Sequence, residues 1–239
     1  MEEKIDFVIT WVDGQDEEWK KEKEKYAKET NLKNDYLFKK WNNNDIRFRD
    51  WDTLKYWFRG VEKYAPWVNK VHFVTYGHLP KWLNTNNPKL NIVKHTDFIP
   101  EKYLPTFNSH TIELNLHRIP GLTENFVYFN DDMFLINKVK QKDFFKNNLP
   151  CDSAVLNQIA FERNIGHADI NNITILNDHF DKNTVIKKNF FKWFNLKYSY
   201  YLIRTLLLMP WKLFPGIYEQ HISINLKKST YEKLWEIEK

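Results

Sequence analysis

Cysteine, glycine and long hydrophobic runs are scarce or absent in this sequence of 239 residues. Cys151 is the single cysteine, so we expect no internal disulfide and a reducing compartment. Six glycines are too few for a fibrous or loop-rich protein. No apolar run reaches the length of about 18 residues that a membrane-spanning helix needs. The start Met-Glu-Glu-Lys does not resemble a signal peptide, and we therefore expect a cytoplasmic protein.

The signature motifs of several large enzyme classes are absent as well. The sequence contains no HExxH, Walker loop, GxSxG, CxxC or GxGxxG. The sequence therefore gives no motif evidence for a serine or cysteine hydrolase, a P-loop kinase or a classical dinucleotide oxidoreductase. The histidines at 72, 95, 167 and 179 have no metal-like spacing. The net charge of +5 is mild and fits an anionic ligand or a membrane surface, and we expect no nucleic-acid partner.

Apolar runs alternate with helical patterns over residues 1–150, and an apolar content of 42% is enough for a sizeable core. Strands are predicted at residues 4–12, 70–75, 91–95 and 125–129. Helices are predicted at residues 16–40 (with a loop at the end), 50–65, 79–83 and 108–117. This alternation predicts an α/β fold with a mostly parallel sheet flanked by helices.

The character of the sequence changes after Pro150, and we expect 151–239 to form a mainly helical, aromatic-rich portion packed on the 1–150 core as an insertion or lid. Within it, 187–215 is strongly apolar but carries basic residues, which are Lys187, Lys188, Lys192, Lys197, Arg204 and Lys212. An ordinary core helix with a basic outer face explains this pattern. A helix lying on the anionic inner face of a membrane explains it too, so peripheral membrane association through 187–215 stays open.

Two adjacent carboxylates follow the buried strand predicted at 125–129. Asn130, Asp131 and Asp132 come directly after it, and paired acids belong where a strand emerges from the interior. Ligands of open α/β sheets bind beyond the carboxyl ends of the strands. Asp131 and Asp132 there suit Mg²⁺ (or Mn²⁺) on a nucleotide diphosphate. The alternative is that these residues cap a helix. Asp13 ends another strand, where Asp-Gly either joins the same site or only makes a turn.

Further polar residues are candidates for binding a substrate. Arg47 and Arg49 either clamp phosphate oxygens or pair with nearby acids on the surface. Asn108 and Ser109 begin a predicted helix, where they either bind an anion or only cap the helix.

Two further candidates contain histidine. His117 and Arg118 lie at the predicted end of the same helix, where cations are favourable in any case. His221 lies in a predicted loop. It is a general base, a donor to phosphate or an ordinary surface histidine, and the sequence leaves these alternatives open.

Long segments resemble one family, the Stealth proteins. These include bacterial capsular polysaccharide phosphotransferases and the animal lysosomal-enzyme GlcNAc-1-phosphotransferase. Residues 5–16, IDFVITWVDGQD, resemble the first block of the family. The third block is similar over roughly 187–235, with His221 at its histidine. Six segments of this sequence resemble, in order, parts of the second block. They are RFRD at 47–50, YAPW at 64–67, VTYGHLPKWLN at 74–84, LPTFNS at 104–109, HRIPGL at 117–122 and YFNDD at 128–132.

The resemblance implies a Rossmann-like domain that transfers a sugar-1-phosphate, such as GlcNAc-1-phosphate. The donor would be a nucleotide diphosphate sugar and the acceptor a hydroxyl of a capsular or surface glycan. By motif position, Asp13, the Asn130-Asp131-Asp132 segment and His221 fall at active-site residues of the family, and Arg49 falls beside the phosphates.

One difference from the family leaves alternatives open. Bacterial members usually continue into a fourth block that contributes a catalytic arginine, and this sequence ends at Lys239 without one. A truncated, inactive module that binds nucleotide sugar or glycan is therefore an alternative. An ordinary glycosyltransferase that uses a nucleotide sugar is another.

Overall fold

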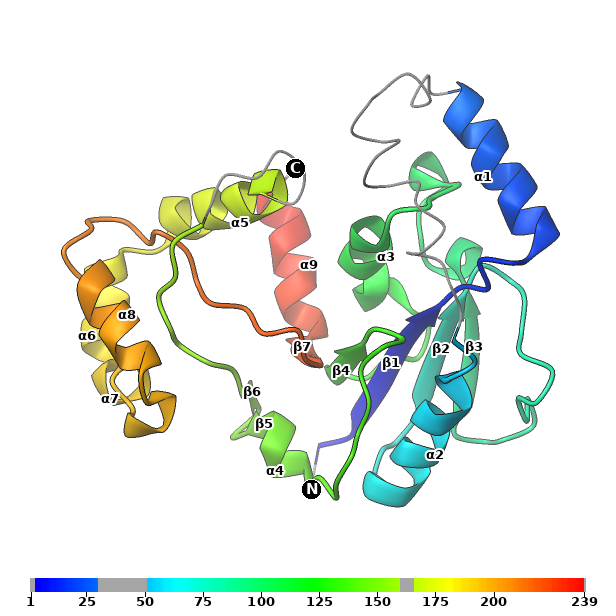
Figure 1. Ribbon diagram of the computed structural model, residues 1–239, viewed down its shortest axis with the longest axis horizontal. Coiled ribbons are helices and arrows are strands. Elements are labelled where there is room, and N and C mark those ends of the chain that lie inside the picture. The colour runs from blue at the N-terminus through cyan, green and yellow to red at the C-terminus, as the bar shows by residue number, and fades with distance from the viewer. Residues whose placement is uncertain (1–2, 30–50, 160–165, 239) are drawn as a thin grey trace. The chain divides into compact units, whose positions relative to one another are not determined.

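The structure is a computed structural model, and it describes residues 3–29, 51–159 and 166–238 (Figure 1). The chain forms two compact units. The first contains Met1–Cys151 and Ile222–Lys239, and the second contains Asp152–His221. The sequence predicts a single portion over 151–239. In the structure the segment from Ile222 onward instead belongs to the first unit, because it contributes a strand to the sheet of that unit.

A five-stranded sheet in the order β3-β2-β1-β4-β7 forms the centre of the first unit (Figure 1). Its strands are β1 (Ile5–Trp11), β2 (Val71–Thr75), β3 (Leu90–Lys94), β4 (Asn125–Phe129) and β7 (Ile224–Lys227). The first four are parallel, and β7 pairs antiparallel with β4. The α/β, mostly parallel sheet flanked by helices is therefore confirmed.

Side chains alternate between the two faces of the sheet and build a separate core on each. Phe7, Ile9 and Trp11 of β1 pack with α2 (Leu54–Tyr64) on one face. Val8 packs on the other face, in the core that includes Leu116 of η6. The helical face predicted within 50–65 is confirmed, since Leu54, Trp57 and Val61 are all buried. Burial of such large apolar side chains contributes about 1.5–3 kcal/mol each.

Helices and short elements complete the first unit. The charged helix α1 (Glu17–Glu29) buries Trp19 and Ala27, as expected for a largely solvated helix. Of the turn and short helix predicted at 79–83, the turn is confirmed, because the Leu83 N–H closes it onto the Pro80 carbonyl, but no helix follows. The other elements are η4 (His95–Asp97), η5 (Glu101–Tyr103), α3 (Ser109–Asn115), η6 (Leu116–Arg118), α4 (Gln141–Phe144), β5 (Phe145–Lys146), β6 (Leu149–Pro150) and α9 (Lys228–Ile237).

The second unit is a small helical cluster. Its elements are α5 (Gly166–His179), α6 (Lys182–Lys188), α7 (Phe190–Trp193), η7 (Leu196–Tyr198) and α8 (Tyr201–Leu208). Five buried apolar residues form its core, which are Leu156, Ile186, Trp193, Leu208 and Phe214. None of the helices in the described part of the chain is long and apolar enough to cross a membrane.

Candidate active site at the carboxyl end of the sheet

The strand order creates a crevice position between β1 and β4. From β1 the chain passes through α2 to β2 on one side, and from β3 it returns through α3 to β4 on the other. The two connections lie on opposite faces of the sheet, because α2 and the α3–η6 region belong to different cores. At such a switch point the loops beyond the carboxyl ends separate and leave room for a ligand. Asp13 follows β1 and Asn130 follows β4, so both flank this position.

Asn130 is held in place by a buried tyrosine. The Tyr128 hydroxyl donates to Asn130 Oδ1 at 2.7 Å, and it lies 3.1 Å from Thr10 Oγ1 at the end of β1. Burial raises the pKa of Tyr128, and the neighbouring Glu113 carboxylate raises it further. The tyrosine therefore stays protonated and donates. Because Asn130 Oδ1 is occupied in this way, its Nδ2 is the group left to donate to a ligand.

Asp13 makes a turn and still keeps an oxygen available. Its Oδ1 accepts from the Gln15 N–H at 2.8 Å, and its own N–H donates to His78 Nε2 at 2.7 Å. Burial lowers the pKa of His78, although Asp16 and Asp13 partly oppose this. The neutral ring therefore accepts the hydrogen bond and fixes the backbone at Asp13. No described residue donates a hydrogen bond to Asp13 Oδ2, so this oxygen can still accept from or bind a ligand.

Asp131 and Asp132 are exposed in a turn directly after β4. The Met133 N–H closes this turn onto the Asn130 carbonyl at 3.1 Å, and no helix begins there. The alternative of a helix N-cap is therefore wrong. Among the residues described, no group of three or more histidine, cysteine or acidic side chains converges as a metal site. Mg²⁺ commonly takes only one or two protein carboxylates and completes its shell with water and phosphate oxygens. Two adjacent exposed carboxylates fit that requirement.

Other predicted site residues lie elsewhere. Arg47 and Arg49 fall outside the described residues. Asn108 caps α3, since its Oδ1 accepts from the His110 N–H at 3.0 Å. This is the simpler of the two predicted alternatives for Asn108, and Ser109 follows as an exposed residue in the first turn. His221 is the exposed last residue of the second unit.

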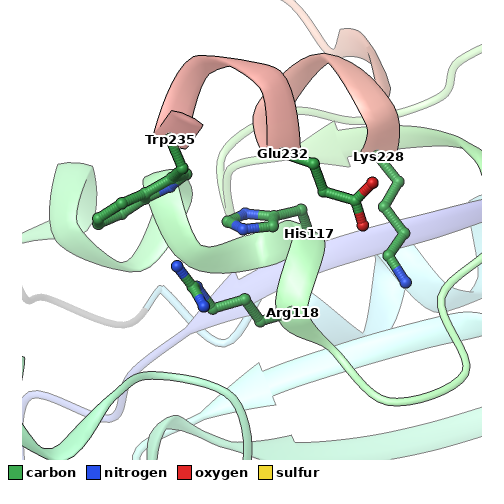
Figure 2. Close-up of a pocket in the computed structure, with 5 residues that line it drawn as sticks. All are labelled: His117, Arg118, Lys228, Glu232 and Trp235. Carbon is green, nitrogen blue, oxygen red and sulfur yellow. The ribbon is translucent and has the colours of Figure 1, made fainter. Parts of the chain in front are cut away.

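His117 and Arg118 line a separate pocket in the first unit. The pocket has a volume of about 320 Å³, and α9 forms its other wall with Lys228, Glu232 and Trp235 (Figure 2). The Arg118 guanidinium lies over the Trp235 ring at 4.9 Å from its centre. The sequence analysis missed the α9 residues, although the Tyr231–Trp235 spacing places two aromatic rings on one helical face.

The pocket lining carries a formal charge of +1, because Arg118 and Lys228 are positive and Glu232 is negative. Burial lowers the pKa of His117 to about 4, and the nearby Arg118 and Lys228 add to this against the opposing Leu114 carbonyl. Neither Arg118 nor Lys228 forms an ion pair with any residue in the described ranges. Two cations without an ion pair therefore outnumber the single carboxylate beside a neutral imidazole, and this balance suits an anionic group.

Comparison with known proteins identifies the family. Two family models match this chain, Stealth protein conserved region 1 at residues 3–30 and conserved region 2 at 47–152. The capsular polysaccharide phosphotransferase WcwK of Streptococcus pneumoniae is 46% identical over 99% of this chain and 69% of its own length. The exopolysaccharide phosphotransferase cps2G of Lactiplantibacillus plantarum is 43% identical over 96% of this chain and 66% of its own length.

A third relative extends this similarity to the whole chain. The receptor polysaccharide phosphotransferase WefC of Streptococcus gordonii is 45% identical over 100% of this chain and 71% of its own length. The chain thus spans about two thirds of the length of these relatives. Both conserved regions and these identities lead to one conclusion: the chain belongs to the Stealth protein family.

Proposed function

We propose that this chain is a phosphotransferase that moves a hexose-1-phosphate, such as GlcNAc-1-phosphate, from a nucleotide diphosphate sugar to a hydroxyl of a capsular or surface glycan. The position of Asp13 and Asn130–Asp132 on either side of the β1–β4 switch point carries this proposal. Its relatives are named as polysaccharide phosphotransferases, which supports the reaction class. The nucleotide sugar and its sugar are part of the proposal.

The donor diphosphate would lie at the carboxyl end of the sheet. Asn130 Nδ2, oriented by the Tyr128 hydrogen bond, would donate to a donor oxygen. Asp131 and Asp132 would hold Mg²⁺ (or Mn²⁺), which when bound neutralises charge on the phosphates. Asp13 borders the nucleotide or the metal. Arg49 would balance the charge that spreads over the phosphoryl oxygens in the transition state.

The reaction would be an in-line displacement at the sugar-linked phosphorus. A new bond forms between the acceptor oxygen and this phosphorus, and the bond from phosphorus to the bridging oxygen of the diphosphate breaks. His221 would take the proton of the acceptor hydroxyl, and a nucleoside monophosphate leaves. The product is a phosphodiester between the sugar and the acceptor. Positioning and fixed charges account for most of the acceleration in such reactions.

The pocket of His117 and Arg118 would bind a phosphate group of the acceptor chain. A polymer joined by phosphodiesters carries anionic groups at regular intervals, and the two unpaired cations of this pocket suit them. A bound phosphate would oppose the effect of Arg118 and Lys228 and raise the pKa of His117 above its value of about 4. Proton NMR titration of His117, with and without a phosphate-containing oligosaccharide, measures this shift.

Analysis of the released nucleotide tests the proposed reaction. The chain is incubated with Mg²⁺, an acceptor glycan and a panel of nucleotide sugars. Release of a nucleoside monophosphate together with phosphodiester product is the expected result. Release of a nucleoside diphosphate would show glycosyl transfer instead. Donor binding without turnover would support the binding-module alternative, and restoring turnover with a longer C-terminus would confirm that the chain alone is incomplete.

A further inference from the structure

The second unit exposes an unusual number of large apolar side chains. Nine of them between residues 190 and 213 are more than half exposed, including Phe191 at 85%, Leu196 at 88% and Leu207 at 69%. The other six are Phe190, Tyr200, Ile203, Leu206, Trp211 and Leu213. Scattered single apolar residues on a surface need no explanation, but a gathering of nine within one short stretch marks an interaction site.

The helix α8 shows that this exposure is built into the fold. Thr205 and Leu208 are buried, as on any helix that packs on a core. On the exposed side, Ile203, Leu206 and Leu207 follow at the three- and four-residue spacing of one helical face. A surface helix normally places polar residues there.

Arg204, the single charged residue of α8, does not lie on this exposed apolar face. Arg204 donates to Asn157 Oδ1 at 2.9 Å and lies over the rings of Tyr201 and Tyr218. The predicted core helix with a basic outer face is therefore wrong for α8. Ile203, Leu206 and Leu207 face outward, whereas Leu208 is buried and Arg204 faces inward.

The same part of the chain carries charge of one sign only. Residues 182–218 contain seven lysines and arginines and no aspartate or glutamate, a formal charge of +7. Since the whole chain carries +5, the rest of the sequence carries +5 − 7 = −2. Lys182 is buried and donates to the Met209 carbonyl at 2.9 Å, so it has a structural role. Five lysines remain exposed for binding, which are Lys187, Lys188, Lys192, Lys197 and Lys212.

We propose that the surface of residues 187–213, called here the basic apolar surface, binds the anionic lipid surface of a membrane. Exposed Phe, Trp and Leu side chains enter the boundary between headgroups and acyl chains. Lysine ammonium groups stay at the level of anionic headgroups, because their flexible stems reach past apolar neighbours. The five exposed lysines of this surface match the negative charge of an anionic bilayer. This inference does not depend on the proposed reaction.

Vesicle co-sedimentation of the full chain tests the proposal. One vesicle population contains phosphatidylcholine alone, and the other contains about 30% phosphatidylglycerol. We expect at least about tenfold stronger partitioning onto the anionic vesicles, decreasing as salt is raised because ions screen exposed charges.

Two sets of variants separate the charges from the apolar contacts. Lys192→Glu with Lys197→Glu should lower partitioning onto anionic vesicles at least about tenfold. Ile203→Ser with Leu207→Ser should lower it on both vesicle types. The matched control is Lys21→Glu with Lys28→Glu, two exposed lysines of α1 in the first unit, which changes the net charge equally and should leave partitioning within about twofold of the unaltered chain. Unfolding curves check that each variant is folded.

Several outcomes would overturn the proposal. No binding to either vesicle type would do so, and so would equal binding to neutral and anionic vesicles. An equal loss in the α1 control would show a general charge effect. Loss of self-association in the Ile203→Ser, Leu207→Ser variant without any vesicle binding would assign the surface to a second copy of the chain instead. Turnover of a water-soluble acceptor by the same variants is measured separately, so a failed reaction and a failed membrane interaction can be told apart.

Discussion

Carboxylates at the two ends of the central sheet differ in their burial and in their hydrogen bonds. At the amino end, Asp6 is fully buried, and its carboxylate accepts from Asn69 Nδ2 at 2.7 Å and from the Thr123 N–H at 2.9 Å. The Nε2 atom of the buried His72 lies 2.9 Å from Asp6 Oδ2. At the carboxyl end, Asp131 and Asp132 are exposed, and Asp13 keeps one oxygen without a described donor.

The difference separates a structural carboxylate from candidate functional ones. Burial raises the pKa of Asp6, but hydrogen bonds from His72, Asn69 and Thr123 outweigh it and hold this pKa below its usual value. A buried charge with all its partners stabilises the fold and has nothing left for a ligand. Acids that stay accessible at a sheet switch point remain open to a ligand. Mutations at the two ends should therefore affect different properties.

Replacing His221 tests whether the second unit contributes to the reaction at the carboxyl end. A general base typically contributes about 10²–10⁴-fold to the rate, so His221→Ala should lower kcat by that amount. The reaction should recover partly at high pH, where hydroxide replaces the missing base. An undiminished rate would remove His221 from the mechanism.

Asp132→Asn should lower kcat by about 10²–10³-fold, the usual effect of losing one group that stabilises transition-state charge. The exposed side chain packs against no core, so the free energy of unfolding should change by less than about 0.5 kcal/mol. Steady-state kinetics and denaturant unfolding are measured on the same preparation. Full turnover would exclude the metal role, and a large loss of stability would place Asp132 with Asp6 as a structural residue.

Acid should weaken the fold through two buried histidines. Burial lowers the pKa of His95 and His117 to about 4, whereas both titrate near 6.5 when unfolded. Between those values the unfolded chain binds more protons, so stability is present above pH 6.5 and lost as the pH falls toward 4. Each histidine accounts for at most about 3 kcal/mol. Denaturant unfolding at a series of pH values should show this slope, and His117→Phe should reduce it.

Asp6→Asn should lower the free energy of unfolding by about 1–3 kcal/mol, because the buried donors from Asn69, His72 and Thr123 lose a charged acceptor. The folded fraction should keep its kcat. The effect should also depend on pH: Asp6 stabilises the fold above its unfolded pKa of 3.8, and this contribution disappears as the pH falls through the lower folded value. If Asp6→Asn kept the normal free energy of unfolding but lost turnover, Asp6 would be a functional carboxylate and not a structural one.

Tyr128→Phe should have the smallest effect. It removes the hydrogen bond to Asn130 and leaves the ring in the core, at a cost of about 0.5–1.5 kcal/mol. Asn130 then loses its fixed orientation, so the KM for the donor should rise a few-fold. Donor binding by calorimetry measures this directly. Unchanged affinity would show that Asn130 does not contact the donor.

Much of the first unit was predictable because its three central strands, β2, β1 and β4, are buried on both faces. The runs ending at Trp11 and Phe129 contain only residues that a parallel sheet accommodates, and polar residues follow each of them. The rule that ligands bind at carboxyl ends then brought Asp13 and Asp131 to one edge. Helix α2 was equally clear, since Leu54, Trp57 and Val61 fix its buried face.

Other features depend on contacts between distant segments that no local pattern specifies. The strand β7 is short and only partly buried, and its place beside β4 is fixed by pairing. The pocket of His117 requires α9 to return to the first unit. In α8, the apolar spacing predicted a helix, but the sequence alone did not show that Arg204 faces inward. Roles for Arg49 and His221 stay predictions from family resemblance.

Transfer of labelled phosphorus from the donor to the polymer is the most direct test of the account. A nucleotide sugar carrying ³²P at the sugar-linked phosphorus is incubated with acceptor glycan and either the unaltered chain or Asp132→Asn. The account predicts that label enters the polymer with the unaltered chain and that the variant transfers it about 10²–10³-fold more slowly at equal stability. Label that stays with the released nucleotide, or transfer by the variant at the full rate, would contradict it.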